Sequence, residues 1–124
     1  MKKEQKTVAF EGKTYNVFTV HAEFGDYDVI LVAKEYDLDG SLAIEVMAVE
    51  NGEVTDYFTR LTTYVNLFLQ SDTRAFVDTN NNPWAEKFIK DNRLGKFAGK
   101  RCGGVYCTYP LYTFDTARFC RETA

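Results

Sequence analysis

Six carboxylates in the first half of the chain form two groups, each beside a predicted turn. They are Glu23, Asp26 and Asp28, then Glu35, Asp37 and Asp39. Paired carboxylates can act as general acid and base, but this needs perturbed groups in a cleft, and turn residues are exposed. A row of carboxylates can instead imitate the phosphates of a nucleic acid and bind an arginine-rich groove. We therefore expect an acidic face that binds a protein with a basic surface.

A second group of charged residues, all basic, lies in the latter half. It consists of Lys87, Lys90, Arg93, Lys96, Lys100 and Arg101, interrupted by the single carboxylate of Asp91. Such a segment can contact phosphates, with Trp84 or Phe97 as a surface on which bases stack. Because the whole chain has a net charge of −3, we expect local contact with nucleic acid and poor general affinity for it.

The charge is divided unevenly along the chain. Residues 7–59 hold eleven acidic side chains against two basic ones, whereas residues 60–124 hold ten basic side chains against six acidic ones. The electric field of such an uneven charge distribution steers association with charged partners, but it says little about the fold.

Other chemistry has little support in the residue spacing. The three cysteines, Cys102, Cys107 and Cys120, match no zinc-binding pattern, and His21 is the only histidine. The Asp37 turn lacks the later ligands of a calcium loop, and residues 95–101 lack the spacing and the Ser or Thr of a P-loop. We predict no metal, no cofactor and no catalytic residue, and hence a binding protein that is not an enzyme.

The elements that must position these residues are mostly strands in the first half. Short β-branched and aromatic runs alternate with turn residues and predict antiparallel strands at residues 8–10, 14–24, 27–36, 42–50 and 54–66. Further strands are predicted at residues 75–78 and 105–114, with a helical turn in the tail after Asp115.

One helix is predicted at residues 83–94. Asn82 is the expected cap, Pro83 suits the first helical position, and Gly95 suits the residue after the end. Residues 96–104 are rich in glycine and lysine and read as a flexible basic loop. The expected fold class is α+β: an antiparallel meander sheet of five to six strands with one main helix packed on a face.

The length indicates a single domain over residues 1–124, with residues 1–6 as a flexible N-terminus. The chain contains no apolar run of the roughly 20 residues that cross a bilayer and no secretory signal, so we expect no membrane contact. An odd number of cysteines argues against a complete disulfide framework and fits a reducing compartment. The expected location is the cytoplasm.

Three stretches carry a resemblance to known proteins. Residues 63–67 read Thr-Tyr-Val-Asn-Leu, residues 78–84 read Asp-Thr-Asn-Asn-Asn-Pro-Trp, and residues 109–112 read Tyr-Pro-Leu-Tyr. Together they resemble a family of small uncharacterised proteins, a domain of unknown function, from gut Firmicutes and their mobile elements. The resemblance implies no catalytic residue. It implies a bacterial protein whose gene neighbours concern conjugation, phage and host defence.

Charge and resemblance together lead to two expectations of function. The first is a non-enzymatic anti-defence protein of the anti-CRISPR type, whose acidic hairpins bind a nucleic-acid-handling partner such as a CRISPR effector or another defence nuclease. The alternative is an accessory protein of plasmid or transposon biology that contacts nucleic acid through the basic residues 87–101.

Overall fold

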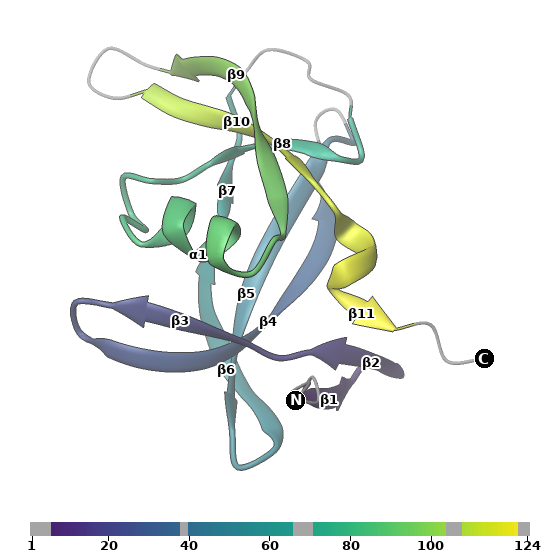
Figure 1. The fold of residues 1–124 in the computed structure, drawn as a ribbon. Coiled ribbons are helices and arrows are strands. Elements are labelled where there is room, and N and C mark those ends of the chain that lie inside the picture. Colours follow the sequence, from purple (N-terminus) through teal and green to yellow (C-terminus); the bar gives the residue numbers. More distant parts are fainter. Residues whose placement is uncertain (1–5, 38–39, 66–70, 104–107, 122–124) are drawn as a thin grey trace.

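A computed structural model describes residues 6–37, 40–65, 71–103 and 108–121. In these ranges the chain is mostly β, with one short helix, α1 (Ala85–Asp91), and one 3-10 turn, η1 (Thr116–Arg118) (Figure 1). The expected α+β fold is therefore wrong. The strands form three antiparallel sheets instead of one meander, because the sheets β1-β2-β11 and β7-β8-β10-β9 pair segments that are not consecutive in the chain.

The first sheet joins the two ends of the chain. Its strands are β1 (Thr7–Phe10), β2 (Lys13–Asn16) and β11 (Cys120–Arg121), in the order β1-β2-β11. β1 and β2 form a hairpin whose turn residues, Glu11 and Gly12, both have positive φ, as a tight two-residue turn requires. The C-terminal tail thus returns to the start of the fold.

The second sheet is the meander that the sequence predicts, reduced to four strands. It contains β3 (Phe18–Ala22), β4 (Gly25–Glu35), β5 (Leu42–Glu50) and β6 (Glu53–Arg60), in chain order. The predicted strand at residues 14–24 is divided at Val17. Asn16 donates its amide hydrogen to Phe119 and Val17 donates to Lys6, whereas Phe18 already pairs with Val29 of β4. The chain changes sheets at this point because its backbone changes partners.

The third sheet has the order β7-β8-β10-β9. Its strands are β7 (Thr62–Thr63), β8 (Arg74–Val77), β9 (Gly95–Gly103) and β10 (Thr108–Phe114). The prediction of a flexible loop over residues 96–104 is wrong for its described part, since residues 95–97 and 101–103 pair with β10, with a register shift between these two paired stretches. Pairing with a strongly β-forming neighbour overrides the low strand propensity of the glycines and lysines. β9 is one of the two edge strands of this sheet.

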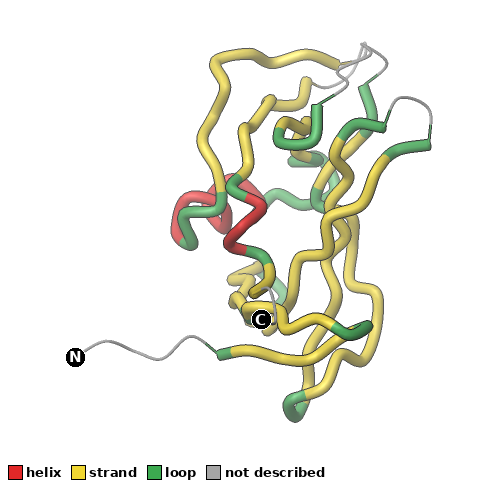
Figure 2. Tube along the Cα trace, turned by 90° about the vertical axis from the view of Figure 1, so that its right-hand side faces the viewer, coloured by secondary structure: helices red, strands yellow, loops and turns green. Residues whose placement is uncertain are grey.

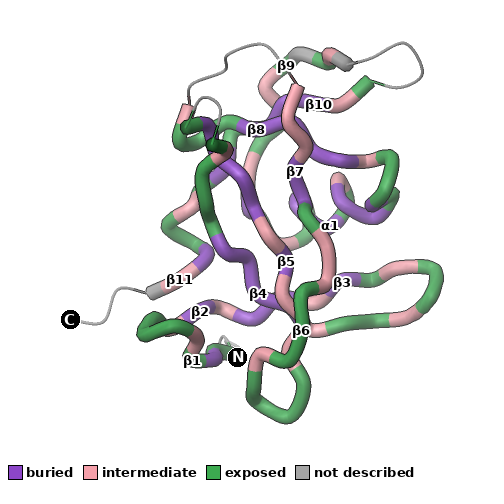
Figure 3. Tube along the Cα trace, turned by 180° about the vertical axis from the view of Figure 1, so that it is seen from behind, coloured by how far each residue is buried: buried purple, intermediate pink, exposed green. Residues whose placement is uncertain are grey.

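The helix lies between the meander and the third sheet (Figure 1) and to one side of the long strands (Figure 2). Its buried residues, Ala85, Phe88 and Ile89, join a core cluster with Phe18 of β3 and Phe114 of β10. The rings of Phe18 and Phe88 meet edge to face at 6.4 Å. Buried residues also follow β4, β5 and β7 (Figure 3). α1 therefore connects the two larger sheets.

The helix is shorter than the predicted range of residues 83–94. Its N-cap is Trp84, without a capping side chain, and not the expected Asn82. It ends before Arg93, which takes the left-handed conformation at φ 54° that we expected of Gly95. Among the residues that the structure describes, no helix is long and apolar enough to cross a membrane.

Candidate nucleic-acid interface

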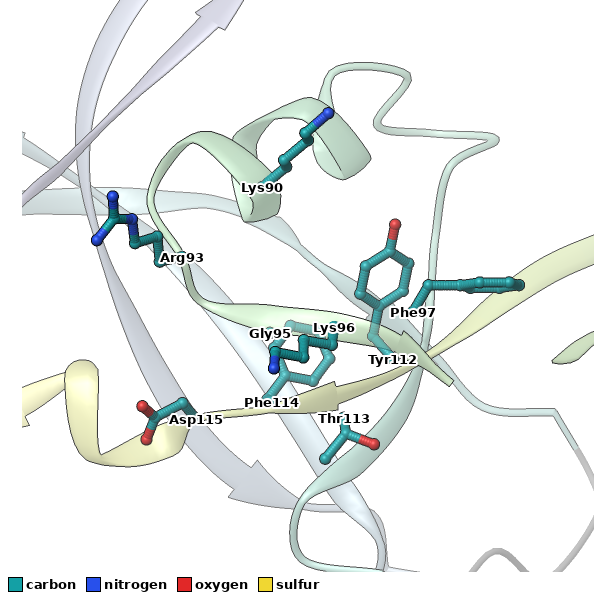
Figure 4. Close-up of a pocket in the computed structure, with 9 residues that line it drawn as sticks. All are labelled: Lys90, Arg93, Gly95, Lys96, Phe97, Tyr112, Thr113, Phe114 and Asp115. Carbon is teal, nitrogen blue, oxygen red and sulfur yellow. The ribbon is translucent and has the colours of Figure 1, made fainter. Parts of the chain in front are cut away.

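A groove of about 800 Å³ opens where the end of α1 meets β9 and β10 (Figure 4). Lys90 and Arg93 contribute from the end of the helix, and Gly95, Lys96 and Phe97 from the edge strand. β10 and the residue after it complete the lining with Tyr112, Thr113, Phe114 and Asp115. The groove is thus built from a helix end and a strand pair, which hold its side chains in place.

An aromatic row lines this groove. Tyr112 pairs with Phe97 and Phe114 pairs with Gly95 across the two strands, so these side chains share one face of the sheet. The rings of Phe97 and Tyr112 lie 5.9 Å apart, and those of Tyr112 and Phe114 lie 6.2 Å apart. Tyr112 and Phe114 are buried, whereas Phe97 is 46% exposed. Phe97 is therefore the ring that a ligand can reach.

Gly95 allows the two strands to approach closely at the start of the row. A Cβ atom at this position would lie 2.6 Å from the carbonyl oxygen of Thr113 and 3.2 Å from the Cα of Phe114. Both are backbone atoms, which cannot turn aside as a flexible side chain does. A larger residue would push β9 away from β10 at the groove.

Three cationic residues, Lys90, Arg93 and Lys96, line the groove, and the side chains of Lys90 and Arg93 extend away from the aromatic rings (Figure 4). All three residues are exposed. Within the described ranges none of them has a carboxylate within ion-pair distance. Asp115 is the one carboxylate among the lining residues. The groove consequently combines an apolar lining with an excess of positive charge.

A polar network fixes the outer side of the aromatic row. The Tyr112 hydroxyl donates a hydrogen bond of 2.6 Å to Oε2 of Glu86, and Nη1 of Arg101 lies 3.5 Å from Oε1 of the same carboxylate. Burial raises the pKa of Tyr112 to about 12, and the hydrogen bond to Glu86 acts in the same direction because it needs the phenolic proton. The Arg101 guanidinium also lies over the Phe97 ring, 5.0 Å from its centre.

The predicted basic residues are only partly brought together. Lys90, Arg93 and Lys96 line the groove, and Arg101 borders it through Phe97. Lys87 is bound to Asp91 at 2.6 Å, one helical turn away, and Lys100 lies in β9. The sequence did not reveal the contribution of Tyr112, Thr113 and Phe114, because these residues reach the groove through the pairing of β10 with a segment that we expected to be a loop.

The predicted acidic residues do not form one face. Glu23, Asp26 and Asp28 lie at the β3–β4 turn, whereas Glu35 and Asp37 lie at the far end of β4 and beyond it. An eleven-residue strand is about 33 Å long, so the two groups are well separated. Asp39 lies outside the described residues.

Two of the acidic side chains at the β3–β4 turn have partners. Oδ1 of Asp26 lies 2.9 Å from Nδ1 of His21. The Thr19 hydroxyl donates a hydrogen bond to Asp28, which also lies 4.0 Å from the Lys6 ammonium group. The remaining members, Glu23, Glu35 and Asp37, are exposed.

The candidate thiols do not gather at a site. Cys102 lies in β9 and Cys120 in β11, in different sheets, and both are free. Cys107 is outside the described part of the chain. In the ranges that the structure describes, no three His, Cys, Asp or Glu residues gather as a metal-binding group.

The asparagine-rich stretch that carries the resemblance forms a structural network. Asn82 is buried, its amide nitrogen donates to the carbonyl oxygen of Arg60 at 2.9 Å, and its amide oxygen accepts from the Thr59 hydroxyl at 3.0 Å. The Asp78 carboxylate accepts hydrogen bonds from the backbone and side chain of Asn81. The stretch therefore ties the start of α1 to the end of β6.

Comparison with known proteins identifies one family. No curated protein and no solved structure matches the chain. A family model, described as a domain of unknown function (DUF4313), matches residues 30–123, which include every residue that lines the groove. Since the match covers most of the chain, this protein belongs to the DUF4313 family.

Proposed function

We propose that this protein binds single-stranded nucleic acid in the groove between α1, β9 and β10. The observation that carries the proposal is that one groove is lined by Lys90, Arg93 and Lys96, three exposed cations without carboxylate partners in the described ranges, and by Phe97, an exposed aromatic ring. The protein would act as a non-enzymatic accessory protein in the cytoplasm, in the setting of plasmid or transposon biology that the resemblance suggests.

The chemistry of the groove favours a single strand over a duplex. Lysine and arginine contact phosphates regardless of base sequence, and aromatic rings add stacking with exposed bases. In a duplex the base faces are already stacked on one another. Arg101 covers one face of Phe97, so a base would stack on the free face of that ring or on the guanidinium plane.

The net charge of −3 does not oppose this proposal, because the charges are segregated. Both predicted acidic groups lie on β4 or beside it, in the other large sheet. Attraction then comes from the field near the groove, which salt screens over about 8–10 Å at physiological ionic strength. We expect modest affinity that falls steeply with salt.

A binding assay with a matched control tests the proposal. The probe is a fluorescein-labelled 12-nucleotide thymidine strand, followed by anisotropy at low salt. The test variant carries Lys90→Gln, Arg93→Gln and Lys96→Gln. The control carries Lys13→Gln, Arg74→Gln and Arg118→Gln, which removes equal charge from exposed residues outside the groove.

The test variant should weaken binding by about tenfold or more, equivalent to about 1.4 kcal/mol, while the control stays close to wild type. Phe97→Ala should weaken binding by about 1–3 kcal/mol, as the loss of one stacked base predicts. Equal losses in the two triple variants would refute the groove as the binding site. A circular dichroism melt of each variant checks that it is folded.

The anti-CRISPR type of inhibitor remains a second proposal, favoured by one feature. The β3–β4 hairpin presents Glu23 and Asp26 beside an exposed aromatic ring, a combination suited to a basic protein surface. Charge reversal at Asp26, Asp28, Asp37 and Asp39 should abolish binding to such a partner, for instance a CRISPR effector, without unfolding the domain. Normal binding by that variant would rule out charge mimicry as the way in which the protein binds its partner.

A further inference from the structure

The β3–β4 hairpin projects beyond the rest of its sheet. β5 pairs with β4 only from Val29 onward, so residues 25–28 have β3 as their only strand partner within the described ranges. The hairpin extends past the neighbouring strands as a two-stranded ribbon (Figure 1), and most residues at its tip are exposed (Figure 3). The tip is thus accessible to a partner.

Aromatic rings hold this tip in place. The ring of Phe24 lies 5.3 Å from that of Tyr27 in a tilted arrangement. Tyr27 lies 5.3 Å from Phe58 of β6, and Phe58 lies 6.2 Å from Trp84 at the start of α1. Although it belongs to this cluster, Phe24 is 64% exposed and Tyr27 is 37% exposed. A ring whose only role was to seal the core would be covered, so the exposed face of Phe24 is available for binding.

A cavity of about 230 Å³ lies between the turn and the start of the helix. It is lined by His21, Ala22, Glu23, Phe24, Pro83 and Trp84. The rings of Phe24 and Trp84, together with His21 and Glu23, therefore border a space suited to one side chain. Asp26 adds a second carboxylate at the tip through its contact with His21.

These features suit a planar cation. A guanidinium group stacks on aromatic faces and donates paired hydrogen bonds to a carboxylate. The N-terminus of α1 is adjacent and carries about half a positive charge. The two negative charges of Glu23 and Asp26 exceed this partial positive charge, so the tip still attracts a cation.

We infer that the β3–β4 tip binds an arginine side chain that a basic protein partner inserts between Phe24 and Trp84. This surface is separate from the groove, since the two share no lining residue. The inference also limits the proposed acidic binding surface to one hairpin, β3–β4, where aromatic contacts matter as much as charge.

The test uses a defined peptide, acetyl-Gly-Arg-Gly-Arg-Gly-Arg-Gly-amide, titrated into the ¹⁵N-labelled protein and followed by amide chemical shifts. A second peptide replaces each arginine with citrulline, which keeps the shape and removes the charge. Variants Phe24→Ala and Glu23→Gln test the tip. Glu53→Gln is the control, because it removes a carboxylate that is also exposed, beside another two-residue turn, that of β5 and β6.

The arginine peptide should shift amides of residues 21–27 and 84, and the citrulline peptide should not. Phe24→Ala should weaken binding about three- to thirtyfold, the range expected for a lost cation–π contact, while Glu53→Gln leaves it unchanged. Absence of binding, shifts spread over all acidic residues, or an equal loss in Glu53→Gln would overturn the inference.

The two surfaces can fail independently. Phe24→Ala should bind the thymidine strand as wild type does, and the variant lacking Lys90, Arg93 and Lys96 should bind the arginine peptide as wild type does. If Phe24→Ala weakened both ligands equally, the tip would not be a separate site.

Discussion

Replacement of Asn82 by alanine tests whether the asparagine-rich stretch is structural. Asn82 is 3% exposed, and its side chain makes two hydrogen bonds, one with Thr59 and one with Arg60. The substitution removes both bonds at once. It leaves the Thr59 hydroxyl without its acceptor and the Arg60 carbonyl without its donor.

The size of the effect follows from these two contacts. A typical hydrogen bond contributes about 1 kcal/mol net, and leaving partly buried groups unsatisfied raises the cost. We therefore expect Asn82→Ala to lower the free energy of unfolding by about 2–3 kcal/mol. For a chain of this length, this corresponds to a fall of about 8–12 °C in Tm.

The assay is urea unfolding followed by circular dichroism, with Asn80→Ala as the control. Asn80 belongs to the same run of asparagines but is exposed, so its replacement should change stability by less than about 0.5 kcal/mol. Thr59→Val combined with Asn82→Ala should cost less than the sum of the single changes, because both remove the same bond. Equal stability of the Asn82→Ala and Asn80→Ala variants would refute the structural role. Below its melting temperature, Asn82→Ala should still bind the thymidine strand.

Two further predictions concern the groove. Gly95→Ala should destabilise the protein by about 1–3 kcal/mol and weaken oligonucleotide binding, because the new Cβ would meet the Thr113 carbonyl at 2.6 Å. Chemical unfolding measures the stability and anisotropy measures the binding. A variant as stable as wild type would show that the strands need no close approach here. Tyr112→Phe should make stability less sensitive to alkali. The pKa of Tyr112 is about 12 in the folded protein and about 10 when unfolded, so the unfolded state loses its proton first and stability falls as pH rises from about 10 to 12. Chemical unfolding at pH 9, 10.5 and 11.5 measures this fall in the free energy of unfolding. An equally steep fall in the Tyr112→Phe variant would show that other groups cause it.

Local features of the chain were predictable where short-range physics decides them. Asn51 and Gly52 both take positive φ and join β5 to β6, as the pair predicts. The alternation in residues 18–24 predicts a core face made of Phe18, Val20, Ala22 and Phe24. Phe18 and Val20 are buried as predicted, whereas Ala22 is half-buried and Phe24 is 64% exposed, because the hairpin extends beyond the sheet at this end. Leu42 to Val46 also form a largely buried strand, as the apolar run indicates. These features depend on neighbours within a few residues.

Features that depend on distant partners were not predictable. β9 is a strand only because β10 pairs with it, and its own glycines and lysines favour a loop. Asn82 has the chemistry of a helix cap, but the same amide instead binds Thr59 and Arg60, residues that approach it through the fold.

The candidate sites likewise contain residues that the sequence predicts and residues that only the fold brings together. The cations of the groove come from one continuous segment and were predicted, whereas Tyr112 and Phe114 reach them across a sheet. The acidic residues looked like one face in the sequence. The length of β4 separates them into two groups.

The salt dependence of oligonucleotide affinity tests the central claim most directly. Contacts between three cations and the phosphates of a single strand predict that log K falls against log salt with a slope of about −2. Lys96→Gln should reduce the slope by about 0.7, as the loss of one phosphate contact requires. A slope near zero, or an unchanged slope in the variant lacking Lys90, Arg93 and Lys96, would contradict the account of the groove as a phosphate-binding surface.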